Sequence, residues 1–391
     1  MKQILFLSIL LFSFSCVEKQ ETMQQLIDRS MQVAVQQSKN MAAALAGSGE
    51  LPRSTDSETG ELLTSGSDWW CSGFYPGTLW YLYEYTNDPE LKTLAEAYTA
   101  LIEKEKTNIG THDLGFMLYC PFGNGLRLAN NQEYVDVLLT GSKSLCSRYN
   151  PTVGLIRSWD HGTWKFPVII DNMMNLEMLM WAFKQSGDSM FLKISESHAD
   201  ITMANHFRSD NSCYHVVDYD TITGGVIAKQ TCQGAFDESI WARGQAWGLY
   251  GYTMMFRETG NEAYLEQAKK IAALMIDHPN MPADQVPYWD YLAVDIPNEK
   301  RDASTASVMA SALIELSGYV DGDLKAKYLQ VAEIQLRTLA SPEYMAEVGT
   351  NGGFILKHSV GAIPLDSEVD VPLTYADYYF VEALLRYKKL L

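Results

Sequence analysis

Two kinds of hydrophobic segment alternate along the chain. Segments of the first kind place Leu, Ala and Tyr at helical spacing and charged residues on the opposite face, as in residues 23–45 and in the stretch from Glu90 to Tyr98. Polar turns such as Gly260-Asn261 open most of them. The pattern predicts amphipathic helices that each keep one side in water.

Segments of the second kind are rich in aromatic residues, Met, Gly and Ala, and poor in Lys and Glu. They span residues 74–85, 113–128, 171–185, 243–258, 303–317 and 375–387. Because they are apolar on all sides, we expect buried helices that the amphipathic helices cover. Six such hairpins closing on themselves predict an all-α fold, an (α/α)6 barrel or six-hairpin toroid. Uneven spacing argues against a regular open solenoid.

Little else interrupts the helices. The stretch 214–227 is the best candidate for a β-hairpin or loop, since alternating β-branched residues are otherwise scarce. No linker or change of composition divides the chain. We therefore expect a single catalytic domain over residues 23–391.

The N-terminus has the pattern of a signal peptide over residues 1–15. Lys2 gives a positive start, and an apolar run too short to span a bilayer follows it. Cys16 then resembles the lipid-accepting cysteine of a bacterial lipoprotein, with ordinary cleavage nearby as the alternative. Residues 16–22 would form a short tether. Either alternative predicts an exported protein, in the bacterial periplasm or anchored to a membrane by lipid through Cys16.

Charge and cysteine content argue against several classes of function and site. The formal net charge of −18 and the absence of a basic stripe in the sequence argue against binding to nucleic acid. Five further cysteines at irregular spacing are no disulfide framework, and no CxxC or HExxH pattern offers a metal site. We expect neither a metal nor a cofactor.

Aromatic residues make up 12% of the chain, which suits sugar binding and core packing equally. The sequence does not determine the oligomeric state.

The predicted ring places its polar candidates together. All inner helices of alternating hairpins run in one direction, so their N-termini open at the same mouth. Trp69 and Trp70 precede the first inner helix, while His112, Asp113 and Asp171 begin the second and third. Positive helix ends at this mouth favour a bound anion.

Asp113 and Asp171 are the candidate catalytic pair. Two carboxylates in different surroundings can hold different protonation states, which sugar chemistry commonly uses. The alternative is that both merely cap helices. His112 is a candidate donor to a substrate, or else an ordinary loop histidine.

A second group of candidates follows in the chain. Trp159 lies in an aromatic loop, residues 158–164, that leads into Asp171. Arg243 and Trp247 share a helix face, where they could bind a carboxylate and a sugar ring. The competing interpretation is a structural pair of Arg243 with an aspartate, next to a core tryptophan.

Five segments, taken in order, resemble glycoside hydrolase family 88, the unsaturated glucuronyl hydrolases. They are residues 69–77, 112–116, 171–176, 241–251, and 367–370 with 375–379. The resemblance covers nearly the whole chain after the signal peptide. It implies an (α/α)6 barrel and an enzyme that removes the unsaturated uronic acid from the non-reducing end of lyase-generated glycosaminoglycan oligosaccharides.

The resemblance also implies roles for individual residues. Asp171 would protonate C4 of the enol ether and activate water to attack C5, and Asp113 would be the second essential carboxylate. The residues that match substrate-binding positions are Trp69 or Trp70, Trp159, His215, Thr231, Gln233, Arg243 and Trp247, with Lys357, His358 and Ser359 in an outer subsite. Cys232 stands where many members have His, which leaves the preferred aglycone open.

Three alternatives remain at this point. A sister family with the same barrel acts on unsaturated galacturonyl-rhamnose from pectin, and ulvan-type substrates are another variant. A standard two-carboxylate glycosidase would cleave saturated glycosides instead. A glycan-capture lipoprotein would bind without turnover.

Overall fold

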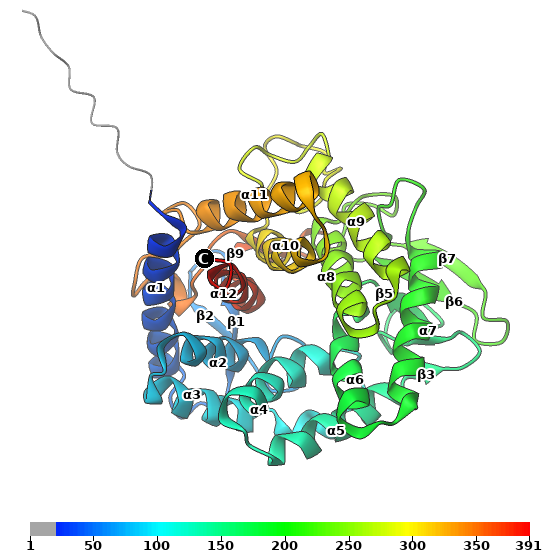
Figure 1. Cartoon of the computed structure of the whole chain (residues 1–391), viewed down its shortest axis with the longest axis horizontal. Coiled ribbons are helices and arrows are strands. Elements are labelled where there is room, and N and C mark those ends of the chain that lie inside the picture. The colour runs from blue at the N-terminus through cyan, green and yellow to red at the C-terminus, as the bar shows by residue number, and fades with distance from the viewer. Residues whose placement is uncertain (1–20) are drawn as a thin grey trace, which may run out of the picture.

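Residues 21–391 are described by a computed structural model and form a double ring of helices (Figure 1). The outer helices are α1 (Met23–Ala44), α3 (Pro89–Ala100), α5 (Glu133–Cys146), α7 (Ser189–His206), α9 (Glu262–Asp277) and α11 (Gly322–Leu339). The inner helices are α2 (Phe74–Thr86), the π-helix η2 (Gly115–Gly123) with α4 (Asn124–Ala129), α6 (Asn172–Ser186), α8 (Ala242–Thr259), α10 (Ala303–Leu316) and α12 (Thr374–Lys388). Since α12 packs on both α10 and α2, the last inner helix closes the ring on the first. The predicted (α/α)6 barrel is confirmed.

Burial explains the two layers. Almost every residue of α10 and α12 is buried, whereas α1 and α9 bury only about half of their residues and keep their other face in water. Five of the six predicted inner segments agree with the observed helices to within about two residues at each end.

The second inner segment differs from the prediction of one continuous helix. Its first part is a π-helix that contains Pro121, and a proline cannot donate the hydrogen bond that an α-helix needs at that point. The π-helix lies close to α6: the Phe116 amide donates to Asn175 Oδ1 at 3.0 Å, and a Cβ at Gly115 would meet the Asn175 backbone at 2.6 Å.

Nine short antiparallel strands lie outside the helices of residues 21–391. They are β1 (Leu51–Thr55) with β2 (Leu62–Ser65), β3 (Tyr149–Asn150) with β4 (Leu155–Ile156), β5 (Pro167–Ile169) with β6 (Val216–Tyr219) and β7 (Val226–Gln230), and β8 (Ser359–Ala362) with β9 (Ser367–Val371). The β6–β7 pair confirms the hairpin predicted over 214–227. The hairpins β1–β2 and β8–β9 were not predicted, and β1 contacts β9.

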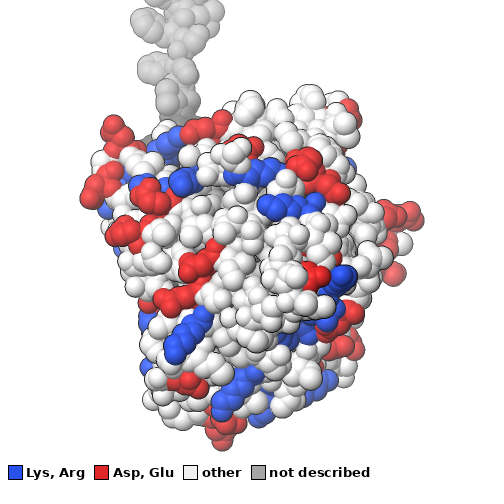
Figure 2. Space-filling model, turned by 90° about the vertical axis from the view of Figure 1, so that its right-hand side faces the viewer, with Lys and Arg blue, Asp and Glu red and all other residues white. Residues whose placement is uncertain are grey.

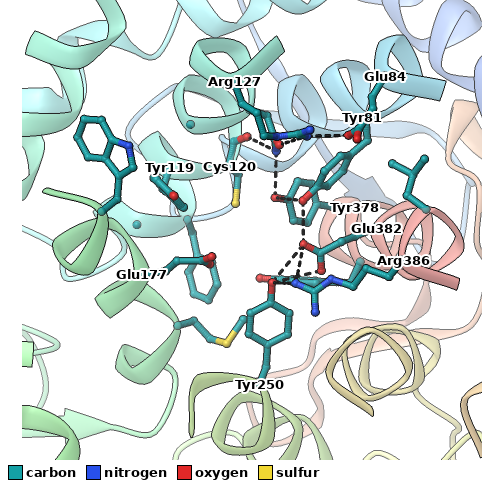
Figure 3. Close-up of a pocket in the computed structure, with 18 of the residues that line it drawn as sticks. Tyr81, Glu84, Tyr119, Cys120, Arg127, Glu177, Tyr250, Tyr378, Glu382 and Arg386 are labelled. Carbon is teal, nitrogen blue, oxygen red and sulfur yellow. Dashed lines mark hydrogen bonds and ion pairs between the residues drawn. The ribbon is translucent and has the colours of Figure 1, made fainter. Parts of the chain in front are cut away.

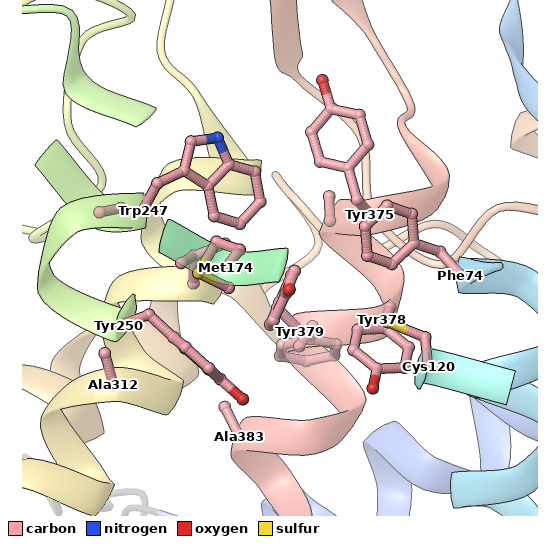
Figure 4. Close-up of a cluster of buried hydrophobic side chains, with 14 of the residues drawn as sticks. Phe74, Cys120, Met174, Trp247, Tyr250, Ala312, Tyr375, Tyr378, Tyr379 and Ala383 are labelled. Carbon is pink, nitrogen blue, oxygen red and sulfur yellow. The ribbon is translucent and has the colours of Figure 1, made fainter. Parts of the chain in front are cut away.

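An aromatic layer crosses the middle of the ring. Trp247 packs on Phe116 and Tyr379 with ring centres 5.3 and 5.5 Å apart, and Phe74 lies beside Tyr375 (Figure 4). Tyr375 and Tyr379 are one turn apart on α12, and they face cavities at opposite ends of the barrel. The layer therefore separates the two mouths.

The predicted signal peptide (1–15), Cys16 and most of the tether (16–22) lie outside the described residues. Within residues 21–391, no helix combines the length and apolar character needed to cross a membrane. One large hydrophobic cluster runs from Met23 to Tyr387, and a small one lies beneath the β5–β7 sheet. The domain boundaries themselves stay a prediction.

Candidate active site

A cavity of about 260 Å³ opens at the mouth where the inner helices begin. Asp171 directly precedes α6, Arg243 is the second residue of α8, and Tyr375 is the second residue of α12. The lining comprises Arg53, Trp69, Trp70, His112, Asp113, Trp159, His161, Ile169, Asp171, Cys232, Gln233, Arg243, Gly361, Ala362, Leu365, Ser367, Glu368 and Tyr375. The volume is below the ~300–1,000 Å³ of drug-sized sites, so only the end of a longer ligand can be enclosed.

Asp171 occupies the N-cap position of α6 but does not cap it. Its side chain accepts no hydrogen bond from the helix, and Oδ2 has no hydrogen-bond partner within residues 21–391. The residue is 8% exposed. Burial raises the pKa of the Asp171 carboxyl from 3.8 to about 7, with the Arg243 guanidinium opposing the rise and the charge of Asp113 adding to it. A carboxyl group with this pKa is partly protonated near neutral pH.

Asp113 faces the same cavity and is held by its neighbours in sequence. Thr111 donates to Asp113 Oδ2 at 2.9 Å, and His112 Nε2 lies 3.3 Å from Oδ1. Burial lowers the pKa of His112, with the Asp113 carboxylate opposing this effect. The structure thus brings together the two predicted carboxylates and His112.

His215 has a defined neutral tautomer. Its Nδ1 accepts hydrogen bonds from the amides of Cys232 and Gln233, at 3.0 and 3.2 Å, so the proton of the neutral ring is on Nε2. Nε2 lies 3.9 Å from Asp171 Oδ2. Burial lowers the pKa of His215 to about 3, assisted by Arg243 and His112, so the ring stays uncharged at neutral pH.

Arg243 is the most heavily bonded cation of the site. It donates to Gln233 Oε1 at 3.0 Å, to Asp302 Oδ2 at 3.3 Å and to the backbone carbonyls of Val360 and Gly361. The pairing with Asp302 is the structural interpretation considered from the sequence. Arg243 nevertheless lines the cavity and is 2% exposed, so its charge acts at the site from a fixed position.

Three predicted tryptophans form the walls. Trp70 packs on Tyr375 with ring centres 4.9 Å apart, and Trp159 stacks on His161 at 5.4 Å. Trp69 is 39% exposed and stands at the rim. Aromatic planes of this kind are suited to the faces of sugar rings.

Six predicted binding residues are not among those that line the cavity. Two of them are His215 and Lys357, whose Nζ donates to the Pro342 carbonyl at 2.8 Å. The other four are Thr231, Ser359, Trp247 and His358. Thr231 accepts a hydrogen bond from the Gly234 amide at 2.8 Å, and Ser359 is fully buried. Trp247 belongs to the aromatic layer, and its indole N–H makes no hydrogen bond of ordinary geometry, although its proximity favours the ionised form of Asp171. His358 Nδ1 lies 2.7 Å from Asp370 Oδ1, outside the cavity. Their roles in binding stay predictions.

Two charged residues of the lining were not among the predicted binding residues, although Glu368 lies in the 367–370 segment of the family resemblance. Arg53 comes from β1 and Glu368 from β9, and Arg53 Nε donates to Glu368 Oε1 at 2.5 Å. Neither strand has the long alternation that identifies a strand from sequence. Glu368 and its neighbours Asp366 and Asp370 have positive φ values of 56°, 48° and 58°. This backbone conformation is unusual for a strand, so β9 is hard to recognise from its sequence.

A raised pKa alone would not have identified the site. Burial also raises the pKa of Asp377 to about 7, but its two oxygens accept the amides of Ile355 and Leu356 at 2.9 Å each. Asp377 is thus a bonded structural group, whereas Asp171 presents an unpartnered oxygen near the cavity.

A second cavity of about 470 Å³ lies at the opposite mouth (Figure 3). Its charged side chains are paired with one another: Arg127 with Glu84 at 2.6 Å, and Arg386 with Glu382 at 3.4 Å. Tyr81 and Tyr250 also donate to Glu382. This cavity therefore offers few free charged groups to a ligand.

The surface charge and the possible metal ligands were also considered as signs of function. On the face shown in Figure 2, acidic and basic side chains are interspersed and no basic stripe is visible. Among residues 21–391, no group of three or more His, Cys, Asp and Glu side chains is placed to hold a metal ion, and the five cysteines are unpaired.

Comparison with known proteins decides the family. The chain is 48% identical over 325 residues to an unsaturated glucuronyl hydrolase of Formosa agariphila, covering 82% of this chain and 80% of the relative. The chain belongs to the unsaturated glucuronyl hydrolases, glycoside hydrolase family 88. No family model matches it.

Solved structures of unsaturated glucuronyl hydrolases have the same fold. A crystal structure of a member specific for heparin is 46% identical with a TM-score of 0.91, covering 93% of this chain and 97% of that one. An aspartate-to-asparagine variant of the Streptococcus agalactiae member, complexed with dGlcA-GalNAc6S, is 26% identical with a TM-score of 0.81, covering 95% of this chain and 93% of that one.

Proposed function

We propose that this chain hydrates the C4=C5 double bond of the unsaturated uronic acid at the non-reducing end of lyase-generated glycosaminoglycan oligosaccharides, with Asp171 as general acid and base. The observation that carries the proposal is the buried, unpartnered Oδ2 of Asp171, whose carboxyl has a pKa of about 7. Relatives named for unsaturated glucuronyl and chondroitin disaccharide hydrolysis support the substrate class.

In the first step the protonated Asp171 carboxyl transfers its proton to C4 of the enol ether. The electron pair of the double bond forms the new C4–H bond, and positive charge develops at C5 and the ring oxygen. The carboxylate left behind stabilises that charge. Asp113 contributes by keeping Asp171 protonated beforehand, since its negative charge raises the Asp171 pKa.

In the second step a water molecule adds to C5. The Asp171 carboxylate takes its proton, which restores the starting carboxylic acid. The resulting C5 hemiketal opens to a ketone, with the ring oxygen becoming a hydroxyl on C1. C1 is then a hemiacetal, and its collapse to an aldehyde releases the next sugar as an alcohol. The net reaction consumes one water.

His215 and Arg243 supply the fixed polar surroundings. The Nε2 atom of His215 lies 3.9 Å from Asp171 Oδ2, so the neutral ring holds an N–H donor beside the carboxyl group. Arg243 and the Gln233 amide present the side of the cavity where the uronate carboxylate would bind.

Ultraviolet absorbance tests the proposal. The conjugated double bond absorbs and hydration removes it, so the signal of unsaturated heparin, chondroitin or hyaluronan disaccharides should fall with the purified enzyme. Unsaturated galacturonyl-rhamnose from pectin serves as the comparison substrate. A flat signal on every glycosaminoglycan disaccharide, with turnover of the pectin or an ulvan fragment, would contradict the substrate assignment.

We also propose that the enzyme works after export, as the pattern of residues 1–15 and Cys16 predicts. Metabolic labelling with a palmitate analogue tests the lipid anchor. Labelling should be lost in the Cys16→Ala variant; equal labelling of parent and variant would contradict it.

A further inference from the structure

Arg53 differs from the other arginine of the cavity in having free donors. Its Nε donates to Glu368, whereas neither terminal nitrogen has a hydrogen-bond partner among the described residues. Arg243, in contrast, uses both terminal nitrogens in bonds to the protein. Arg53 is thus the cation of this cavity whose terminal N–H groups are free to donate to a bound anion, whereas Arg243 acts on the uronate carboxylate through its charge.

The guanidinium of Arg53 is held in a fixed plane. Its central carbon lies 4.5 Å from the centre of the Trp69 ring, and Glu368 anchors the edge that carries Nε. The two remaining nitrogens form a fork, the geometry in which arginine binds an oxyanion through two parallel hydrogen bonds. Preorganisation of this kind reduces the entropy lost on binding.

The position of Glu368 is maintained against backbone strain. Its φ of 56° lies in the left-handed region, which is unfavourable for a glutamate. A Cβ at the neighbouring Gly361 would come within 2.6 Å of Glu368 Oε2, so only glycine allows the two strands to approach this closely. Strain of this kind concentrates at ligand-binding positions.

Depth in the cavity places Arg53 beside the second sugar. Asp171, Arg243 and His215 are almost fully buried, while Trp69 is 39% exposed at the rim. If the end sugar lies against Asp171, the sugar that follows it must lie at the level of Trp69 and Arg53. With a net charge of −18, the protein needs a local cation to hold an anionic group there.

We propose that Arg53 binds a sulfate group on the sugar that follows the unsaturated uronic acid, with Trp69 and Glu368 as positioning residues. This inference rests on the proposed function, because it names a feature of that substrate. Arg53 would then determine which leaving sugar the enzyme prefers, while the chemistry at Asp171 stays the same.

The test compares unsaturated heparin and chondroitin disaccharides without sulfate and with a single sulfate at each position of the amino sugar. For parent and Arg53→Gln, the measured quantity is the ratio of kcat/KM for each sulfated substrate to that of its unsulfated counterpart. We expect Arg53→Gln to lower this ratio about 10- to 100-fold for one sulfate position, the usual cost of losing a charge-assisted hydrogen-bonded contact. The affected position identifies the sulfate.

Arg29→Gln is the matched control. Arg29 is an exposed arginine paired with Glu21 at 3.0 Å, outside the residues that line the cavity, and its variant should keep the parental ratios. If Arg53→Gln does not fold, the parent itself decides: its preference for the sulfated substrate should weaken as salt rises from about 0.02 to about 0.3 M, through screening.

Unchanged ratios at every position in Arg53→Gln would overturn the inference, as would a salt-independent preference in the parent. An equal loss on sulfated and unsulfated substrates would also overturn it, since Arg53 would then contact the uronate or support the fold. A parent that consumes no unsaturated disaccharide would refute the proposed function itself, which is a distinguishable result.

Discussion

The Nε2 atom of His215 lies 3.9 Å from Oδ2 of Asp171, and neither atom has a hydrogen-bond partner within residues 21–391. Two backbone amides fix the His215 tautomer from the other side of the ring. A neutral N–H donor and a carboxyl group with a raised pKa therefore lie side by side, both buried.

This relationship makes His215→Asn and His215→Gln an informative pair. Asn keeps an acceptor where Nδ1 receives the amides but removes the donor near Asp171, while Gln keeps a donor at the far end and loses that acceptor. We expect His215→Asn to fold like the parent and to lose about 10- to 100-fold in kcat. His215→Gln should lower the melting temperature because two amides lose their partner. Parental kcat in His215→Asn would rule out the donor role.

The pH dependence of kcat/KM follows from the Asp171 pKa. Asp171 must be protonated to deliver its proton, and its pKa in the free enzyme is about 7. The rate should therefore fall about tenfold per pH unit above pH 7. A bound uronate adds negative charge beside Asp171 and raises its pKa further. The fall of kcat, which reports the substrate-bound enzyme, should therefore begin at a higher pH than the fall of kcat/KM. Rates that rise from pH 7 to pH 9 would contradict this assignment.

The same pKa has a consequence for stability. Because the folded-state pKa of about 7 exceeds the ordinary 3.8, the contribution of Asp171 to stability is fully present below pH 3.8 and is lost as pH rises to 7. Asp171→Asn removes this loss. Above pH 7 the variant should have a larger free energy of unfolding than the parent, by up to about 4 kcal/mol. Urea unfolding at pH 5 and pH 8 measures the difference, and a variant less stable than the parent at pH 8 would disagree with it.

Arg243→Ala should affect both stability and binding. The side chain donates to Asp302, Gln233 and two carbonyls, which the substitution leaves without their donor. We expect a loss of about 3 kcal/mol or more in the free energy of unfolding, as for other broken buried ion pairs, together with a raised KM. Arg29→Ala serves as the surface control. If Arg243→Ala had the same free energy of unfolding as the parent, Arg243 would serve ligand binding alone.

The alternation of buried and amphipathic helices could be predicted because each helix carries its own periodic pattern. The common direction of the inner helices then placed Asp113, Asp171 and Arg243 at one mouth. The π-helix that ends at Gly123 was missed, since its apolar pattern resembles that of an α-helix and only Pro121 indicates the difference.

The two hairpins at the rim could not be predicted for a different reason. Arg53 and Glu368 are 315 positions apart in the sequence, and no local pattern reports a contact of that range. The strand of Glu368 contains two residues with positive φ, Glu368 and Asp370, a backbone conformation that the sequence pattern does not reveal. The part of the site that faces the leaving sugar therefore became visible only in the folded chain.

Hydration of an enol ether by Asp171 can be separated from ordinary glycoside hydrolysis in a single comparison. Parent and Asp171→Asn are each incubated with an unsaturated disaccharide and with its saturated counterpart, while absorbance and release of the amino sugar are followed together. Only the parent with the unsaturated substrate should react, with one amino sugar released for each double bond lost. Cleavage of the saturated disaccharide at a similar rate, or parental turnover by Asp171→Asn, would contradict it.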